Sequence, residues 1–150
     1  MAPRDALPQM TEILNSGGSF RLMVTGNSML PFLRHRQDRV ILAPVSRPIR
    51  RGDILFYLRG PEICILHRVH SIRADGSLLM CGDAQVALEP IREGQVLACV
   101  THVERNGKKI SCEGLSWQLL CEFWRRLHVI RPYLLAILRK LHLIRYAVLD

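Results

Sequence analysis

Short, largely apolar runs bounded by polar turn residues fill the middle of the chain and predict β-strands. Turn residues separate these runs, and both 74–76 (ADG) and Asn106-Gly107 are typical of hairpin turns. The pattern predicts a compact, mainly β domain over residues 19–113, with a coiled or barrel-like sheet. The expected strands are 20–26 (FRLMVTG), 39–45 (RVILAPV), 54–58 (ILFYL), 63–72 (ICILHRVHSI), 77–80 (SLLM), 96–105 (VLACVTHVER) and 108–112 (KKISC).

Apolar residues at helical spacing replace these short runs at both ends of the chain. Residues 1–18 are expected to contain a short amphipathic helix that ends at Gly17 and Gly18. Residues 114–150 predict amphipathic helices, which Pro132 is expected to divide in two. The apolar stripe of these helices is expected at positions 120, 123, 127, 130, 134, 138, 141, 144 and 148.

The composition indicates one folded domain and limits its location. Hydrophobic residues make up 49% of the 150 residues, which is enough for a real core. The N-terminus carries Asp5 and lacks the apolar run of a signal peptide, and no segment has the roughly 18 uncharged apolar residues of a membrane-spanning helix. We therefore expect a cytoplasmic protein, with peripheral attachment to the inner face of the membrane as a second hypothesis.

Charge and cysteine content narrow the classes of partner. A formal net charge of +8 is compatible with an acidic partner, but no helix-turn-helix, zinc-finger or RNA-binding motif is recognisable, so no nucleic acid is expected. The five cysteines form no Cys-x-x-Cys pair, so we expect reduced, mostly buried thiols and neither a metal site nor a cofactor.

Two motifs carry candidate chemistry. Ser28 lies in GNSMLPF, where a strand is expected to turn, and His67 lies in the strand-like run ILHRVH. A serine becomes a nucleophile when a base removes its proton, and histidine is the side chain that does this near neutral pH. A carboxylate should orient that imidazole, and both Asp83 in CGDA and Glu89 in ALEP are candidates. Each motif alone is more typical of an ordinary turn or a structural histidine.

The order of the motifs resembles the signal peptidase I superfamily of serine endopeptidases. The similarity spans roughly residues 20–105, and it rests on four blocks in the order of that superfamily. These blocks are GNSMLP at 26–31, QDRVIL at 37–42, RGDILFY at 51–57 together with ILHRV at 65–69, and CGDA at 81–84. The resemblance implies the coiled β fold that signal peptidases share with the SOS repressors, here with a short N-terminal helix and a C-terminal helical appendage.

The resemblance also implies roles for individual residues. Ser28 would be the nucleophile, and His67 would be the general base of the archaeal and endoplasmic-reticulum type, because no lysine precedes Lys108. Asp83 or Glu89 would orient His67, and the choice between them stays open. The oxyanion hole and substrate subsite would involve Gly26, Asn27, Met29 and Pro31, with the backbone N–H of Ser28 as the main donor. The other histidines, at 35, 70, 102, 128 and 142, are expected to have helical or surface roles.

The resemblance implies a substrate and leaves alternatives. A peptide or protein with small residues next to the cut would bind by strand addition beside Ser28. A non-catalytic peptide-binding or scaffold protein with the same fold is the alternative. Residues 115–149 mix arginines with tryptophans and leucines, so they are expected either to bind an anionic membrane surface or to pack on the β domain or a partner.

Overall fold

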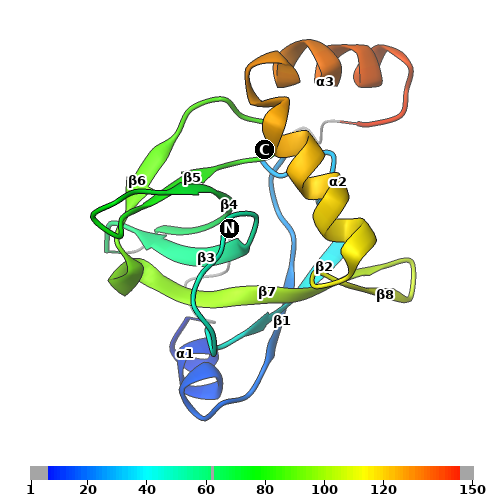
Figure 1. Ribbon diagram of the computed structural model, residues 1–150. Coiled ribbons are helices and arrows are strands. Elements are labelled where there is room, and N and C mark those ends of the chain that lie inside the picture. The colour runs from blue at the N-terminus through cyan, green and yellow to red at the C-terminus, as the bar shows by residue number, and fades with distance from the viewer. Residues whose placement is uncertain (1–6, 62, 146–150) are drawn as a thin grey trace.

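The computed structural model describes residues 7–61 and 63–145 and consists mainly of one antiparallel sheet (Figure 1). Its eight strands are β1 (Phe20–Met23), β2 (Asp38–Ala43), β3 (Ile54–Arg59), β4 (Ile63–Ile72), β5 (Leu78–Cys81), β6 (Glu89–Ile91), β7 (Val96–Arg105) and β8 (Lys108–Ser111). They are paired in the order β1-β2-β7-β3-β4-β5-β6, and β8 pairs with β7. The expectation of a mainly β domain is confirmed.

The sheet coils around two apolar clusters. The larger cluster contains Leu33, Val40 and Phe56 and extends to the helices at both ends of the chain. The smaller cluster, which includes Leu55 and Met80, fills the other side of the central strands. Residues 54–57 of β3 are all buried, because β3 lies between β4 and β7 and is covered on both faces.

The register of the central strands places the candidate histidine. Leu55 of β3 lies opposite His67 of β4. Tyr57 is two positions after Leu55 in β3, so Tyr57, Leu55 and His67 project from the same face of the sheet. The β4–β5 pairing shifts between Val69 and Ser71, which makes His70 a bulge residue. The neighbouring Arg68 projects from the opposite face of β4 to His67.

Helices occupy both ends of the described chain. Helix α1 (Leu7–Asn15) buries Met10 and Leu14 against the larger cluster. Helices α2 (Leu115–Arg126) and α3 (Arg131–Lys140) are joined by a 3-10 turn at His128–Ile130, so the predicted division near Pro132 is confirmed. Figure 1 shows α2 along one side of the sheet and α3 at the end of the molecule. None of the helices within residues 7–61 and 63–145 is long and apolar enough to cross a membrane.

The apolar stripe expected in the C-terminal helices is only partly correct. Positions 120, 123, 130 and 141 are exposed, whereas Cys121, Trp124, Arg131 and Leu135 are buried. Both sides of these helices carry large apolar residues, and the turn at 128–130 changes the helix direction, so one continuous stripe cannot describe them. Position 148 lies outside the described residues.

Candidate functional site

Ser28 lies in the turn that follows β1, and a glycine allows the chain to enter this turn. Gly26 has a φ of 90°, a conformation that side-chain-bearing residues rarely adopt. Its backbone N–H donates a hydrogen bond of 2.8 Å to Nδ1 of His35. This contact fixes the start of the turn, and it gives His35 a structural role that the sequence did not indicate. It also occupies the N–H of Gly26, so this group is not a free oxyanion donor.

The serine turn is held against the loop that contains Gly82 and Asp83. The backbone N–H of Ala84 donates to the carbonyl oxygen of Ser28 at 2.8 Å. A Cβ atom at Gly82 would lie 2.6 Å from the same carbonyl oxygen, so only glycine permits this close approach. The two motifs GNSM and CGDA, which are far apart in sequence, therefore form one structural unit.

Ser28 and His67 line the same pocket, which has a volume of about 230 Å³. One wall consists of residues 22–26, at the end of β1, and the other consists of residues 63–67, in the first half of β4. Strand β1 is at one edge of the sheet, and β5 pairs with β4 only from Arg68 onward. In the part of the chain that the structure describes, the backbone edge of residues 63–67 on this side therefore has no strand partner.

The pocket is mainly apolar. Leu22, Met29, Phe56 and Leu66 contribute to its lining, and Met29 is almost completely buried. Asn27 and Pro31, by contrast, belong to the turn itself and not to this lining. The carbonyl oxygen of Asn27 accepts a hydrogen bond of 3.2 Å from the N–H of Leu30. Met29 thus lines the pocket beside the serine, whereas Asn27 and Pro31 belong to the turn.

His67 contacts a tyrosine that leads to Glu89. Nδ1 of His67 lies 3.4 Å from the hydroxyl oxygen of Tyr57, and that hydroxyl donates a hydrogen bond of 2.7 Å to Oε2 of Glu89. Arg59 donates two further hydrogen bonds to Glu89, of 2.6 and 2.5 Å. Glu89 is therefore connected to His67 through Tyr57, and the connection differs from the direct carboxylate–imidazole contact expected from the sequence.

The electrostatics keep His67 neutral. Burial, and then the positive charge of Arg59, lower the pKa of His67 to about 4 against the opposing effects of Glu89 and Asp83. The hydrogen bonds from Arg59 lower the pKa of Glu89, so its carboxylate is ionised at neutral pH. Burial, and then the contact with Glu89, raise the pKa of Tyr57, so its hydroxyl keeps its proton. A neutral imidazole is the form that accepts a proton.

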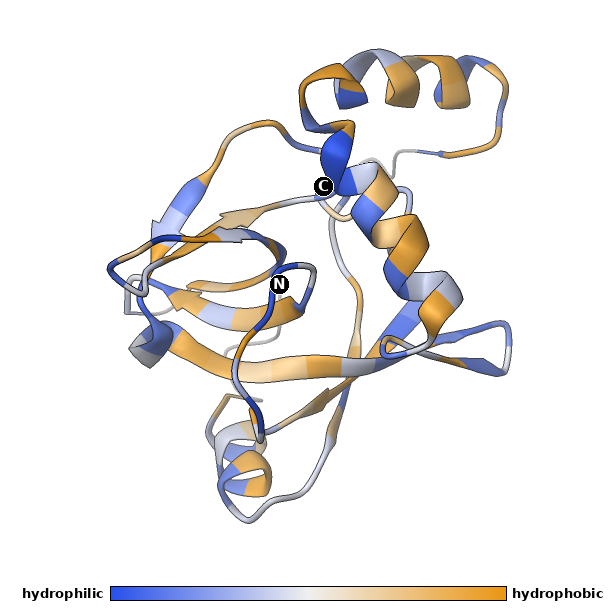
Figure 2. Ribbon diagram, in the orientation of Figure 1, coloured by the Kyte–Doolittle hydropathy of each residue, from blue (hydrophilic) through white to orange (hydrophobic). Residues whose placement is uncertain are grey.

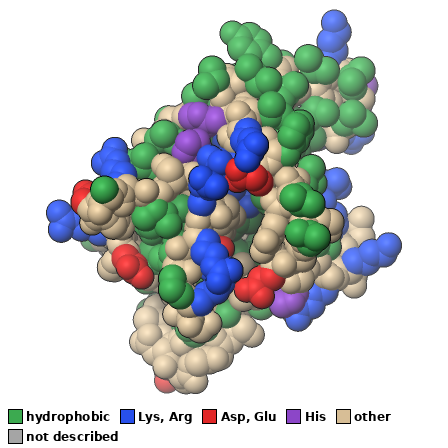
Figure 3. All heavy atoms as spheres, in the orientation of Figure 1, with side chains coloured by type: hydrophobic (Ala, Val, Ile, Leu, Met, Phe, Trp, Pro, Cys, Tyr) green, Lys and Arg blue, Asp and Glu red, His purple; other side chains and the backbone are tan. Residues whose placement is uncertain are grey.

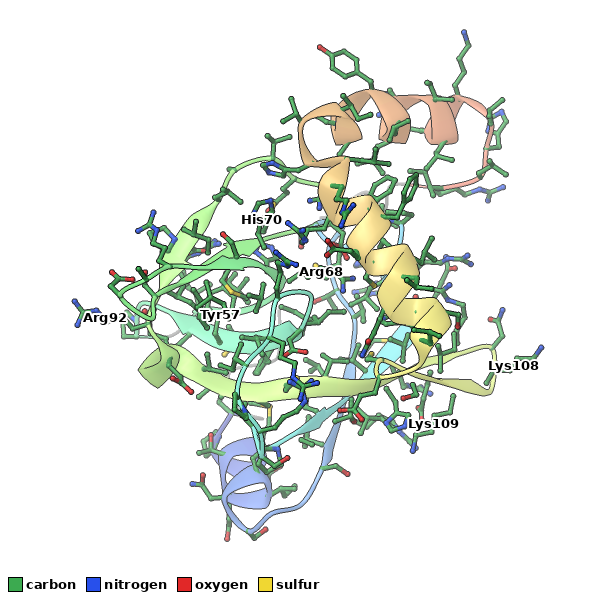
Figure 4. All side chains as sticks on the ribbon, in the orientation of Figure 1. Tyr57, Arg68, His70, Arg92, Lys108 and Lys109 are labelled. Carbon is green, nitrogen blue, oxygen red and sulfur yellow. The ribbon has the colours of Figure 1, made fainter. Side chains whose placement is uncertain are left out.

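Asp83 is paired with Arg68 and not with His67, which a catalytic acid would contact. Its carboxylate is fully buried and accepts two hydrogen bonds from Arg68, at 2.8 and 2.7 Å. Arg68 also donates to the carbonyl oxygen of Gly52 at 2.9 Å and lies over the ring of Phe32. Figure 4 shows Arg68 on the side of the sheet that faces α2. Asp83 thus fixes the loop under Ser28 and makes no hydrogen bond to His67.

The candidate nucleophile and base share a pocket but are not hydrogen-bonded. Within the described residues, the structure gives no hydrogen bond between Ser28 and His67. A catalytic contact between them stays a prediction, and hydrogen bonds of this kind often tighten only when substrate is bound.

Two other expectations concern metals and lysines. In residues 7–61 and 63–145, no group of three or more His, Cys, Asp or Glu side chains could hold a metal ion. All five cysteines are free thiols, as expected. Lys108 and Lys109 project from the β7–β8 turn (Figure 4), and Lys140 is exposed on α3. A lysine that acts as a general base must be buried so that its pKa is lowered, and none of these three lysines is buried.

Several residues of the site escaped the sequence analysis. Tyr57 and Arg59 lie on the strand beside His67, and their contacts became visible only with the register of β3 and β4. The spacing of Tyr57 from Leu55 was a usable signal, since residues two apart share one face of a strand. The close contact of Gly82 with the carbonyl oxygen of Ser28 was also missed, although Gly82 belongs to the CGDA block.

No protein-family model, curated protein or solved structure matches this chain. The resemblance to signal peptidases therefore rests on the sequence blocks alone, and the residue roles that it implies are treated as proposals below.

Removing the tyrosine hydroxyl offers a test of the contact between Glu89 and His67. On the hypothesis that Ser28 and His67 cleave a peptide, we expect Tyr57→Phe to lower kcat/KM about tenfold, the rate equivalent of one ordinary hydrogen bond. Stability should change little, because Glu89 keeps Arg59 as a partner. Tyr133→Phe, at an exposed position on α3, is the matched control. Equal kcat/KM values for the two variants would exclude a positioning role for Tyr57.

The lowered pKa of His67 predicts how stability depends on pH. The unfolded chain takes up this proton near pH 6.5, whereas the folded protein does so only near pH 4. The unfolded state therefore binds more protons between these values, and the free energy of unfolding should fall as the pH drops from about 6.5 to about 4. Urea denaturation of His67→Asn should show a shallower decline than that of the wild type. Burial lowers the pKa of His70 as well, so part of the decline should persist in this variant.

Proposed function

We propose that this protein is a serine endopeptidase that cleaves a leader-type or signal-type peptide. Ser28 would attack the scissile carbonyl, and His67 would take its proton and later pass it to the leaving amine. The observation that carries the proposal is the shared pocket, in which a serine on a fixed turn and a buried, neutral histidine lie between two strand edges.

Strand addition explains how a peptide would reach Ser28. Among the described residues, neither the backbone edge of residues 63–67 on this side nor the outer edge of β1 has a strand partner. An extended peptide placed there would form main-chain hydrogen bonds with these edges, and its alternate side chains would enter the apolar lining. The volume of about 230 Å³ suits small side chains next to the cut, in line with the resemblance to signal peptidases.

Glu89 is the acid that the geometry favours for the catalytic network. It is connected to His67 through the hydroxyl of Tyr57, and Arg59 keeps it ionised. Asp83 would act indirectly, by holding the loop on which the carbonyl oxygen of Ser28 rests. The backbone N–H of Ser28 would donate to the oxyanion, since the N–H of Gly26 is already bonded to His35.

Labelling with an acylating probe tests this proposal. A fluorophosphonate or β-lactam probe should form an adduct at Ser28 of the wild type, detected by peptide mass mapping, and none in Ser28→Ala or His67→Ala. A digest of an extended-peptide library should then yield cleavage products only with the wild type. An adduct at another residue, or cleavage that survives Ser28→Ala, would refute the assignment.

A non-catalytic peptide-binding protein is the second candidate. One observation favours it, namely that no hydrogen bond joins Ser28 to His67 in the described structure. The wild-type protein and Ser28→Ala would then bind the same peptides with equal affinity, and neither protein would cleave them.

A further inference from the structure

Large apolar side chains are exposed mainly on the C-terminal helices. Ten of the sixteen exposed large apolar residues among the described ones lie on α2, on α3 or next to them. They are Leu115, Leu119, Leu120, Phe123, Val129, Ile130, Tyr133, Ile137, Leu141 and Leu143, and we call them the outer face. Figure 2 shows hydrophobic and hydrophilic colours mixed along both helices, and Figure 3 shows hydrophobic side chains gathered at the end of the molecule where α3 lies.

The outer face is fixed in position because the opposite side of the helices is attached to the β domain. The indole N–H of Trp124 donates to the carbonyl oxygen of Asp83 at 2.9 Å. The buried guanidinium of Arg131 donates to the carbonyl oxygens of Trp124, Gly82 and Gln85, at 3.2 to 3.4 Å. The rings of Trp117 and Phe32 form a T-shaped contact, with their centroids 5.5 Å apart. One side of these helices thus packs on the β domain, and among the described residues the outer face stays exposed.

Positive charge accompanies the outer face. Between residues 115 and 145, Glu122 is the only acidic residue, whereas six residues are arginine or lysine. Glu122 is engaged by Arg125 and Arg126, both on α2. The C-terminal side of the face carries Arg139, Lys140 and Arg145, all of which are exposed. Long cationic side chains beside exposed leucines can bind phosphates while their alkyl parts lie on the apolar surface.

We propose that the outer face docks on an anionic lipid surface, with its apolar side chains in the acyl boundary and Lys140 and Arg145 on lipid phosphates. A second copy of the chain fits less well, because the same positive charges would meet across the interface. The arrangement is interfacial, since no described helix is long enough to span a bilayer. The inference goes beyond the proposed peptidase activity and does not depend on it, because neither Ser28 nor His67 belongs to the outer face.

Vesicle flotation tests the docking. We would use the Ser28→Ala protein, so that the result does not depend on catalysis, with vesicles of phosphatidylcholine alone or with 30% phosphatidylglycerol. We expect binding at least tenfold stronger to the anionic vesicles, and weaker binding as salt is added. The double variant Lys140→Glu/Arg145→Glu should lose at least tenfold, since each cation near such a surface contributes about 1 kcal/mol. Lys108→Glu/Lys109→Glu, on the β7–β8 turn, is the matched control.

A second pair of variants tests the apolar contribution. Phe123→Ser/Tyr133→Ser changes two exposed residues of the outer face, and Val45→Ser/Leu88→Ser changes two exposed apolar residues elsewhere. Only the first pair should weaken flotation, again at least tenfold, and thermal melting should show that both pairs are folded. Equal flotation of all variants, or no flotation of the parent protein, would overturn the proposal. A concentration-dependent dimer that only Phe123→Ser/Tyr133→Ser abolishes, without vesicle binding, would assign the face to a second copy instead.

Discussion

Ser28→Ala and His67→Ala are each expected to lower kcat/KM for a cleaved peptide by at least about a thousandfold. A serine hydroxyl is a poor nucleophile without a base, and alanine removes either the attacking oxygen or the group that accepts its proton. Residues that act as one unit also show strong non-additivity, so the double variant should be no slower than the single ones. The measurement is the initial rate on a peptide selected from a library digest with the wild-type protein.

Two controls separate chemistry from folding. Ser28 is half-buried and its side chain is small, so Ser28→Ala should leave the urea midpoint almost unchanged. His35→Ala removes a histidine that does not line the pocket and that accepts a hydrogen bond from the N–H of Gly26, so its effect on rate should be far smaller than that of His67→Ala. Multiplying losses in the double variant would show that Ser28 and His67 act independently, and the proposed mechanism would then be wrong.

The fold was largely predictable because most strands carry their own signal. The runs at 63–72 and 96–105 match β4 and β7, and the Asn106-Gly107 turn joins β7 to β8 as expected. Strand β6 was missed, since it is three residues long and contains Pro90. A proline is compatible with a strand only at an edge, and β6 is the edge strand next to β5. Pairing with β5, which is a tertiary contact, is what makes this segment a strand.

The candidate site was less predictable because its contacts depend on register. The sequence predicted Ser28 and His67 as partners, and both line one pocket of the structure. It could not show that Tyr57 stands between His67 and Glu89, because that contact requires β3 to pair with β4 in a particular alignment. It also could not distinguish Asp83 from Glu89, since both follow His67 at a distance that several loop paths allow.

Arg68 explains why the two acids differ. It follows His67 directly in β4, so its side chain projects from the other face of the strand. Asp83 is drawn to that face by two charge-assisted hydrogen bonds, together with the packing of Gly82 on Ser28. Glu89 lies on β6 and reaches the face of His67 through Tyr57. Two consecutive residues of the HRV block therefore have different roles. His67 is the candidate base, and Arg68 is the cation that holds the loop of Gly82 and Asp83 beside the serine turn.

Asp83→Asn is accordingly expected to destabilise the fold strongly, by about 3–5 kcal/mol, because it leaves the buried guanidinium of Arg68 without its countercharge. The loss would be measured as the change in the free energy of unfolding in urea. Glu104→Gln is the matched control, since it breaks a pair with the exposed Arg21 and should change this free energy by less than about 1 kcal/mol.

The double variant Arg68→Met/Asp83→Leu tests whether stability depends on the ion pair itself or only on side chains that fill the same space. Replacing both partners of a buried ion pair by apolar residues is often neutral, so it should recover much of the stability that Asp83→Asn loses. If Asp83 instead acted mainly on His67, Asp83→Asn would stay as stable as the wild type and lose only activity. In that case the direct orienting role would belong to Asp83, and the connection through Tyr57 to Glu89 would be structural.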